Sequence, residues 1–335
     1  MTLGNTPIVE VDGVLAKLEC CNPCGSIKER IAEFILHKSK ATGELKPGQP
    51  IIEATSGNTG IAMAYYGRAA GHPVTIVMPE NMTEERKALI RGFGADLILC
   101  SVKGSFAEAA EIRDRLAKER GWFNPDQFSN PYNVECHRTT TGAELLEQLE
   151  GRTLDAFVAG VGTGGTLIGI GEALRERYPT VHLAAVEPAE SAVMTGGDTG
   201  PHAIYGIGDG FIPAIASDGS GGTHPLINEA IDVSSQDAID AAIELKEKFQ
   251  ICVGISSGAN FVAARRLRCR FETVATVFAD GFEKYTAHGL TRCEGGCAHA
   301  DRCSFPIREV AKRIGASPMP QTTTDQTGAP TPPRQ

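Results

Sequence analysis

The chain has 335 residues, about twice the length of a typical domain, and 41% of them are hydrophobic, which predicts a globular protein with one large or two medium-sized domains. Its 32 Lys and Arg stand against 41 Asp and Glu, for a net charge of −9, which argues against a nucleic-acid or membrane partner bound mainly through phosphates. The longest uncharged stretch in the middle of the chain, 156–171, is too short and too rich in glycine to span a membrane, and the amino terminus lacks the pattern of a signal peptide, so we expect a cytoplasmic protein.

Short apolar runs alternate with amphipathic stretches of helix length along most of the chain. In chain order, the expected strands lie at 14–19, 50–54, 74–78, 96–100, 156–161, 182–186 and 274–279. The expected helices lie at 27–41, 61–70, 84–92, 106–120, 140–150, 167–178, 235–249 and 259–268. Such alternation is typical of an α/β protein with a largely parallel sheet. A segment rich in Asn, Pro and Ser at 124–133 predicts a boundary between two α/β lobes, and the Pro- and Thr-rich segment 317–335 predicts a disordered tail.

The first motif with residues suited to catalysis, NPCGSIKER at 22–30, leads into the first long helix. Ser26 is expected to cap this helix and Glu29 to complete a capping box, which places Lys28 in the first turn. There the helix macrodipole lowers the pKa of an amine and favours the neutral nucleophile that a Schiff base requires. Because most lysines in first turns are simply solvated, the spacing alone leaves both interpretations open.

The second motif, TSGNTG at 55–60, joins a strand to a helix. Its hydroxyls and the free N–H groups at the helix start suit a carboxylate ligand, and Asn58 has an amide that suits a ring hydroxyl. An ordinary N-cap followed by a glycine turn is the alternative.

The third motif, GVGTGGT at 160–166, has the form of a phosphate cradle, because successive N–H groups and a positive helix end meet there. It also matches the dinucleotide pattern G-x-G-x-x-G, and Glu187 ends the next strand where an NAD enzyme places its ribose carboxylate. A tight turn without a ligand is the third possibility.

The fourth motif, GISSG at 254–258, precedes a helix. Its serines are expected to cap that helix, or one of them faces a ligand heteroatom. The G-x-S-x-G form around Ser256 also raises a hydrolase nucleophile, for which His288 and His299 follow in the chain.

Taken in order, these motifs resemble the cysteine synthase (O-acetylserine sulfhydrylase) family of fold type II pyridoxal-phosphate enzymes, which includes cystathionine β-synthase. The resemblance covers about the first 285 residues and rests on LGNTPIV, NPCGSIKER, EATSGNTGIAMA, QFSNPYN, TTGAEL, VAGVGTGGTLIG, AVEP, GIGDGFIP and GISSGAN. It implies two three-layer α/β domains, as in the tryptophan synthase β-subunit, with the cofactor between them. The implied ranges are 24–130 for the smaller N-terminal domain, 1–23 and 131–290 for the larger cofactor-binding domain, and 291–316 for a Cys-rich extension.

The resemblance also assigns roles to single residues. Lys28 is similar to the lysine that binds pyridoxal phosphate, Asn58 to the residue at its ring hydroxyl, and Ser256 to the residue at its ring nitrogen. The phosphate loop is implied at Gly162, Thr163, Gly164, Gly165 and Thr166. The substrate carboxylate pocket is implied at Thr55, Ser56, Thr59 and Gln127, and a loop near the substrate amine at 206–208, beginning with Gly206.

The implied reaction is β-replacement, in which O-acetylserine and sulfide give cysteine and acetate through an aminoacrylate. A hydroxyl at the ring nitrogen, unlike a carboxylate, does not hold the pyridine protonated, which favours prompt loss of a β-leaving group over transamination. Cystathionine β-synthase and a cysteine-degrading lyase remain alternatives within the family, with a sulfide or thiol as co-substrate, and an NAD-binding oxidoreductase remains one outside it. A homodimer is the implied assembly.

Two features depart from the family pattern. Cys24 replaces a hydroxyl or small residue, and 279–282 reads ADGF where the family carries a serine before glycine. In addition, Cys293, Cys297 and Cys303 form a C-x3-C-x5-C array with His299 inside it. Three thiolates can hold zinc or an iron–sulfur cluster, with His299 or a cysteine of the group 20–24 as the fourth ligand, although the spacing fits no standard zinc pattern well.

Overall fold

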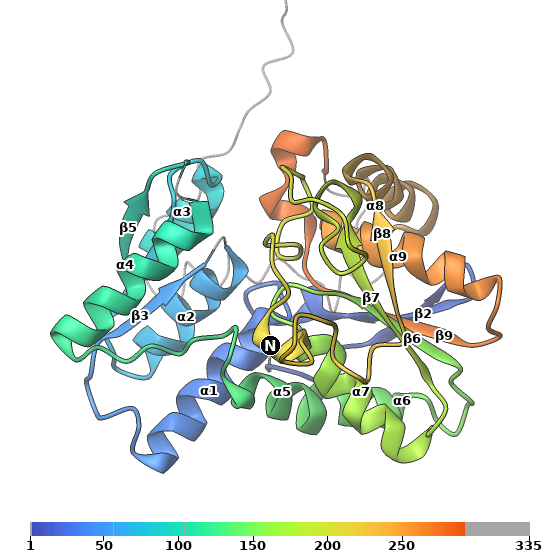
Figure 1. Ribbon diagram of the computed structural model, residues 1–335, viewed down its shortest axis with the longest axis horizontal. Helices are drawn as coiled ribbons and strands as arrows, with labels where there is room; N and C mark the ends of the chain where they lie inside the picture. Colours follow the sequence, from blue (N-terminus) through green and yellow to red (C-terminus); the bar gives the residue numbers. More distant parts are fainter. Residues whose placement is uncertain (1, 56, 104, 292–335) are drawn as a thin grey trace, which may run out of the picture.

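The computed structural model describes residues 2–55, 57–103 and 105–291, which form two sheets covered by helices (Figure 1). The larger sheet has the strand order β1-β2-β9-β6-β7-β8, and the smaller has the order β3-β4-β5. Only the β1–β2 pair is antiparallel among the described strands. The strands are β1 (Ile8–Val11), β2 (Val14–Leu18), β3 (Ile51–Ala54), β4 (Val74–Pro79), β5 (Asp96–Cys100), β6 (Ala156–Gly160), β7 (His182–Pro188), β8 (Glu229–Val233) and β9 (Val274–Phe278). The predicted α/β class is confirmed.

The helices occupy the segments between the strands, as the alternating pattern predicts. They are α1 (Lys28–Thr42), α2 (Asn58–Ala69), α3 (Glu84–Gly92), α4 (Ser105–Arg120), α5 (Pro131–His137), α6 (Ala143–Gln148), α7 (Gly165–Arg177), α8 (Ser235–Phe249) and α9 (Ile255–Arg268). Helix α5 lies partly in the segment predicted as a boundary, because Pro131 takes the first helical position and the Asn130 side chain caps the Tyr132 N–H at 2.9 Å.

The larger sheet is the middle layer of three. In β2, Val14, Ala16 and Leu18 pack in one core with α8 and α9, whereas Leu15 packs on the opposite face in a core that includes α6 and α7. Alternate side chains of a strand point to opposite faces, so a strand that is buried throughout, as β2 is, requires helices on both sides. Figure 1 shows α8 and α9 on one side of this sheet and α6 and α7 on the other.

The smaller sheet is built in the same way. Ile51 of β3 packs in a core with α1, α2 and α3, and the next residue, Ile52, packs in a second core with α4. Both sheets are thus three-layer sandwiches. All three strands of the smaller sheet fall within 24–130, and none of the described strands of the larger sheet does. This agrees with the predicted division into domains. The exact limits of the domains stay a prediction.

A cluster of charged side chains is buried where α1, β2 and α6 meet. Arg30 binds Glu19 (Nε–Oε2, 2.6 Å) and Glu144 (Nη1–Oε1, 2.7 Å), and Lys17 also binds Glu144 (Nζ–Oε2, 2.8 Å). The side chains of Lys17 and Glu19 have no exposed surface. The cluster fixes the first helix, and with it Lys28, against the carboxyl end of β2 in the larger sheet.

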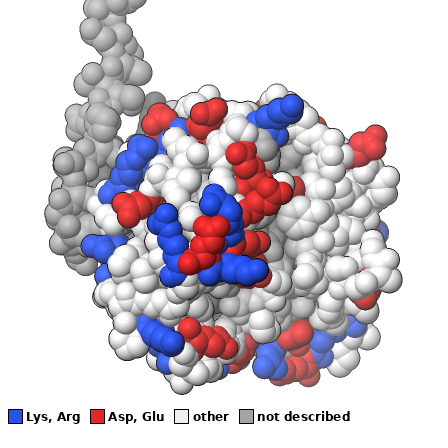
Figure 2. Space-filling view, turned by 60° about the vertical axis from the view of Figure 1, so that its left-hand side comes forward, with Lys and Arg blue, Asp and Glu red and all other residues white. Residues whose placement is uncertain are grey.

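The surface fits the expectation from net charge. On the face in Figure 2, Lys and Arg side chains lie beside Asp and Glu, without a continuous basic patch among the described residues. Among the residues that the structure describes, no helix is both long enough and apolar enough to cross a membrane.

Candidate active site

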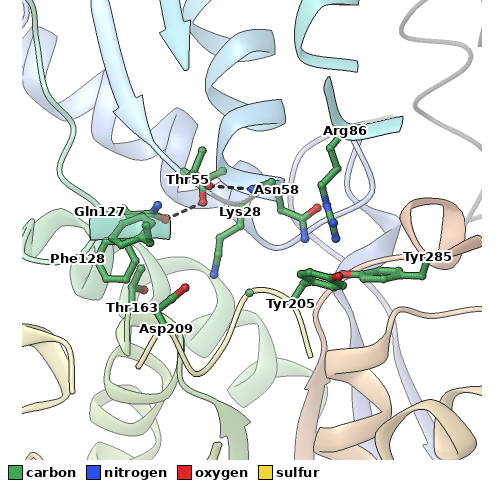
Figure 3. Close-up of a pocket in the computed structure, with 15 residues that line it drawn as sticks. Lys28, Thr55, Asn58, Arg86, Gln127, Phe128, Thr163, Tyr205, Asp209 and Tyr285 are labelled. Atoms are coloured by element: carbon green, nitrogen blue, oxygen red, sulfur yellow. Dashed lines mark hydrogen bonds between the residues drawn. The ribbon is translucent and has the colours of Figure 1, made fainter. Parts of the chain in front are cut away.

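One pocket collects most of the residues that the sequence motifs single out (Figure 3). Lys28 opens α1, Thr55 follows β3, Asn58 opens α2, and Gly162 and Thr163 follow β6. Because ligands bind at the carboxyl ends of parallel strands, turns that are far apart in sequence meet here. The lining residues are Lys28, Thr55, Gly57, Asn58, Thr59, Arg86, Phe106, Gln127, Phe128, Gly162, Thr163, Tyr205, Gly206, Asp209 and Tyr285.

Lys28 is the first residue of α1, as expected, but Ser26 does not cap the helix. The N-cap is Ile27, without a side-chain cap, and its N–H donates to the Ala279 carbonyl at 2.8 Å. The strand end at β9 thus holds the start of the helix in place of the serine hydroxyl. Only half of the predicted capping box forms, because Glu29 accepts the Ser26 N–H at 3.1 Å.

The amine of Lys28 is half-buried in the pocket. Burial lowers its pKa, and the carboxylates of Asp209 and Asp280 offset part of that effect. The predicted direction is confirmed, although the main cause is burial and not the helix macrodipole. A larger fraction of the amine is therefore neutral, and so nucleophilic, than in an exposed lysine.

The glycine-rich loop after β6 has room only for glycine. A Cβ at Gly162 would lie 2.2 Å from the Gly206 carbonyl oxygen, and one at Gly165 would lie 1.9 Å from Asn133 Oδ1. Gly164 has a φ of +88°, and α7 begins directly after it. Asn133 Nδ2 fixes the loop by donating to Thr163 Oγ1 at 3.0 Å. A helix start preceded by such a loop suits an anion, so the predicted phosphate cradle stays a prediction that this geometry favours.

The turn after β3 presents hydroxyl and amide groups to the same pocket. Thr59 donates to Gln127 Oε1 at 2.7 Å, and Asn58 Nδ2 donates to Asp280 Oδ2 at 2.8 Å. Helix α2 starts at Asn58 with Gly57 as N-cap and no side-chain cap, so the alternative of an ordinary capping motif is wrong. Ser56, the fourth predicted carboxylate ligand, lies outside the described residues.

Comparison with known proteins decides the family. Residues 1–280 match the family described as "Pyridoxal-phosphate dependent enzyme". A cysteine synthase of Staphylococcus aureus is 41% identical over 303 residues, covering 86% of this chain and 94% of the relative. The chain is a member of the pyridoxal-phosphate dependent enzyme family.

Two solved structures share the fold of this pyridoxal-phosphate dependent enzyme. A hydrogen sulfide-producing enzyme of Fusobacterium nucleatum has a TM-score of 0.81 and 39% identity, over 90% of this chain and 92% of the other. A cysteine synthase of Entamoeba histolytica has a TM-score of 0.80 and 35% identity, over 91% and 94%. The expected fold type II architecture is thereby confirmed.

The pocket of this pyridoxal-phosphate dependent enzyme fits its family's cofactor. Asn58 Oδ1 is buried without a hydrogen-bond partner, which is costly unless a ligand supplies one. The glycine cradle at 162–166 suits a phosphate, and Lys28 suits the aldehyde carbon of the cofactor. His137 lies beneath the cradle with its Nε2 3.3 Å from Thr166 Oγ1, and burial lowers its pKa to about 3, so it adds no charge there.

The position of Ser256 is less direct. It lies in the first turn of α9 and is 6% exposed, but it is not among the residues that line the pocket. Helix α9 starts at Ile255, four residues earlier than expected, with Gly254 as N-cap and no serine cap. A Cβ at Gly254 would lie 2.1 Å from Asp280 Oδ1, so this helix start packs directly beside the Asn58–Asp280 contact.

The two alternatives from other classes lose their structural basis in this enzyme. Glu187 is 1% exposed and accepts the N–H groups of Met194 (2.7 Å) and Thr195 (2.8 Å), so it is not open to a ribose. No strand leads into α9, although a hydrolase elbow requires one before the nucleophile.

The proposed metal site is not supported by the described part of the chain. Cys293, Cys297, Cys303 and His299 lie outside the described residues, and within residues 2–55, 57–103 and 105–291 no group of three His, Cys, Asp or Glu side chains is placed to hold a metal. Cys24 is 2% exposed, and burial raises its thiol pKa, which works against a thiolate ligand.

Sequence reasoning missed several pocket residues. Asp209 stands between two glycines in GIGDGFIP, and a lone charge in such a run was the available signal. Arg86 belongs to a helix with many charged residues, where nothing in the spacing distinguishes it. The other missed lining residues are Phe106, Phe128, Tyr205 and Tyr285.

Proposed function

We propose that this enzyme catalyses β-replacement, in which O-acetylserine and sulfide give cysteine and acetate. The observation that carries the proposal is the meeting, at one pocket, of Lys28, the described residues of the turn 55–59, and Gly162 and Thr163 of the glycine-rich loop. The relative from S. aureus is named a cysteine synthase, which supports the same reaction.

Four parts of the chain would hold pyridoxal phosphate. Lys28 would bind it covalently through Nζ, the loop 162–166 would bind its phosphate, Asn58 would face its ring hydroxyl, and Ser256 its ring nitrogen. When bound, the cofactor supplies an electron-withdrawing ring that stabilises negative charge at the substrate Cα.

The remaining chemistry belongs to side chains of this chain. Thr55, Thr59 and Gln127 bind the substrate α-carboxylate and orient the Cα–H bond, with Ser56 as the fourth expected ligand. Once the amino acid displaces it, Lys28 Nζ removes the Cα proton and later returns it, a step that its lowered pKa favours. The carboxylate of the substituent departs from Cβ, and sulfide then forms the new C–S bond.

Gln127 gives a direct test of the carboxylate pocket. In Gln127→Ala the KM for O-acetylserine is expected to rise by about tenfold or more, because a hydrogen bond to a charged group is lost, while the KM for sulfide stays within about twofold. Gln127→Glu should raise the KM for O-acetylserine further, since a carboxylate repels a carboxylate. Cysteine and acetate are measured together in a steady-state assay.

The matched control is Gln236→Ala, on the exposed surface of α8, which should leave both KM values unchanged. Equal rises of the two KM values in Gln127→Ala would count against the assigned pocket. Formation of acetate without cysteine by the wild-type enzyme would count against β-replacement itself.

A second candidate is sulfide release from cysteine, and Asp209 favours it. Figure 3 shows Lys28 extending toward Asp209 in the pocket. Burial raises the pKa of this carboxyl, so it keeps its proton to higher pH than an exposed aspartate and can protonate a departing thiolate. A carboxylate leaving group needs no such proton.

Asp209→Asn separates the two reactions. Sulfide release from cysteine should fall by about tenfold or more, while acetate release from O-acetylserine should change by less than about threefold. Both rates are measured on one preparation, by sulfide trapping and by acetate assay. Equal effects on both reactions would remove the argument for the second candidate.

The oligomeric state, the cellular compartment and the domain division of the enzyme belong to the same proposal. A homodimer in the cytoplasm is the assembly that the family resemblance implies. The proposed division into a smaller domain, 24–130, and a larger one, 1–23 with 131–290, would put the cofactor between two α/β units.

A further inference from the structure

A buried guanidinium with two donor atoms that no described side chain partners lies at one end of the pocket. Arg86 of α3 lines the pocket and is 2% exposed. Its Nε and Nη1 have no hydrogen-bond partner among the side chains that the structure describes. Charged side chains are seldom buried in proteins unless they are paired. Nε and Nη1 of Arg86 therefore lack the partner that their burial demands.

The surrounding groups fix the position of the guanidinium without neutralising it. The carbon of the guanidinium lies 4.7 Å from the ring centre of Tyr205 and 5.2 Å from that of Tyr285. The absence of a side chain at Gly57 admits Arg86, since a Cβ there would lie 2.7 Å from Nε. These cation–π contacts and a hydrogen bond to the Tyr285 side chain offset part of the cost of burial, but they leave Nε and Nη1 free for an anion.

The location of Arg86 indicates which anion it serves. Figure 3 shows Gln127 and Arg86 on opposite sides of Lys28 and Asn58. The proposed α-carboxylate ligands lie on the Gln127 side, and the proposed phosphate cradle is the loop after β6, so both expected anionic groups have sites elsewhere. A second acidic group on the substrate is left to bind Arg86. The planar fork of arginine suits a carboxylate in particular.

We propose that Arg86 binds an anionic oxygen group carried on the substrate β-carbon. This rests on the proposed β-replacement and names its substrate class: alanines whose β-substituent is an oxyanion or leaves as one. The carboxylate that departs from an O-acyl substrate belongs to this class. Arg86 is then a specificity-determining residue that also stabilises the leaving group.

L-Aspartate and L-asparagine provide a matched pair of probes, because they differ only in a carboxylate or an amide on the β-carbon. Their dissociation constants are measured by titrating the cofactor-loaded enzyme and following its visible absorption. The wild-type enzyme should bind aspartate at least about tenfold more tightly than asparagine. In Arg86→Gln this ratio should fall to about one, and in Arg86→Lys it should lie between the two.

Arg91→Gln is the matched control, because it removes the same charge from an exposed position on the same helix. It should keep the preference for aspartate. Equal binding of both probes by the wild-type enzyme would overturn the proposal. So would a parallel loss of affinity for aspartate, asparagine and alanine in Arg86→Gln, since Arg86 would then bind the α-carboxylate.

The same titration distinguishes failure of this assignment from failure of the proposed function. Absence of the visible band of bound cofactor would contradict the proposed function itself. If the enzyme shows the band and turns over O-acetylserine but has no preference for aspartate, only the assignment of Arg86 is contradicted. Melting temperatures of the three variants show whether each keeps the fold.

Discussion

Replacement of Lys28 by alanine is expected to reduce cysteine formation by about 10³-fold or more. The variant loses the amine that binds the cofactor and the base that moves the Cα proton, and no other lysine lines this pocket within the described residues. The measurement is the initial rate of cysteine formation from O-acetylserine and sulfide at saturating pyridoxal phosphate.

Two controls, one variant and one chemical rescue, make the result specific. Lys40→Ala, at an exposed position on the same helix, should keep the wild-type rate. Adding a small primary amine to Lys28→Ala should restore part of the rate, because a free amine can take over the proton transfer. Turnover within about tenfold of wild type in Lys28→Ala would contradict the assigned role.

The second large effect concerns stability. Glu19→Gln is expected to lower the free energy of unfolding by about 3–5 kcal/mol, because it removes the fully buried partner of Arg30 and leaves Glu144 alone to balance the buried charges of Arg30 and Lys17. The matched control is Glu10→Gln, whose ion pair with Arg152 is more than half exposed on both sides and is worth at most about 1 kcal/mol. Urea unfolding at pH 7 measures both variants.

The effect of Glu19→Gln depends on pH in a defined direction. Burial opposes the charge of Glu19, but Arg30 more than offsets this and holds the pKa of the carboxyl below its usual range. In the same cluster Arg30 and Lys17 lower the pKa of Glu144 to about 2 against the cost of burial. A lowered pKa contributes stability above the unfolded pKa, and this is lost as pH falls through the folded value.

The difference between wild type and Glu19→Gln should therefore be constant above about pH 5 and shrink as the pH falls from about 4.5 toward 2. Unfolding midpoints at several pH values check this. A difference that grows toward low pH, or one no larger than that of Glu10→Gln, would contradict the account of the cluster.

The sequence predicted most of the architecture because buried parallel strands are apolar on both faces. The expected strand at 96–100 and the helices at 84–92 and 235–249 coincide with β5, α3 and α8. Strands β1 and β8 were missed, since they lie at the two edges of the larger sheet and are largely half-buried, with one charged residue in β1 and two in β8. Their positions depend on pairing with distant segments and not on local pattern.

Helix starts were harder to predict where they belong to the site. Helices α2 and α9 begin earlier than expected, at Asn58 and Ile255, and neither has a side-chain cap. In both turns the polar side chains are not used for capping, so rules derived from capping mislead there. The same departure left Asn58 with an unpartnered buried oxygen, which is part of the evidence for a ligand.

The residues that the chain motifs could not reveal are those brought in by tertiary structure alone. Arg86 and Tyr285 are almost 200 residues apart and come within 5.2 Å of each other, guanidinium carbon to ring centre. Neither lies in a glycine-rich turn, so no local spacing marks them. The proposed cofactor-binding residues could be predicted from sequence because they lie in glycine-rich turns. The pocket residues proposed to select the substrate could not, because they lie outside such turns.

The central claim is that Lys28 carries the cofactor, and chemical trapping tests it most directly. The enzyme loaded with pyridoxal phosphate is reduced with borohydride, digested, and mapped by mass spectrometry. The account predicts a single phosphopyridoxyl group on the peptide that contains Lys28, and none after reduction of Lys28→Ala. Labelling of another lysine with Lys28 unmodified would contradict it.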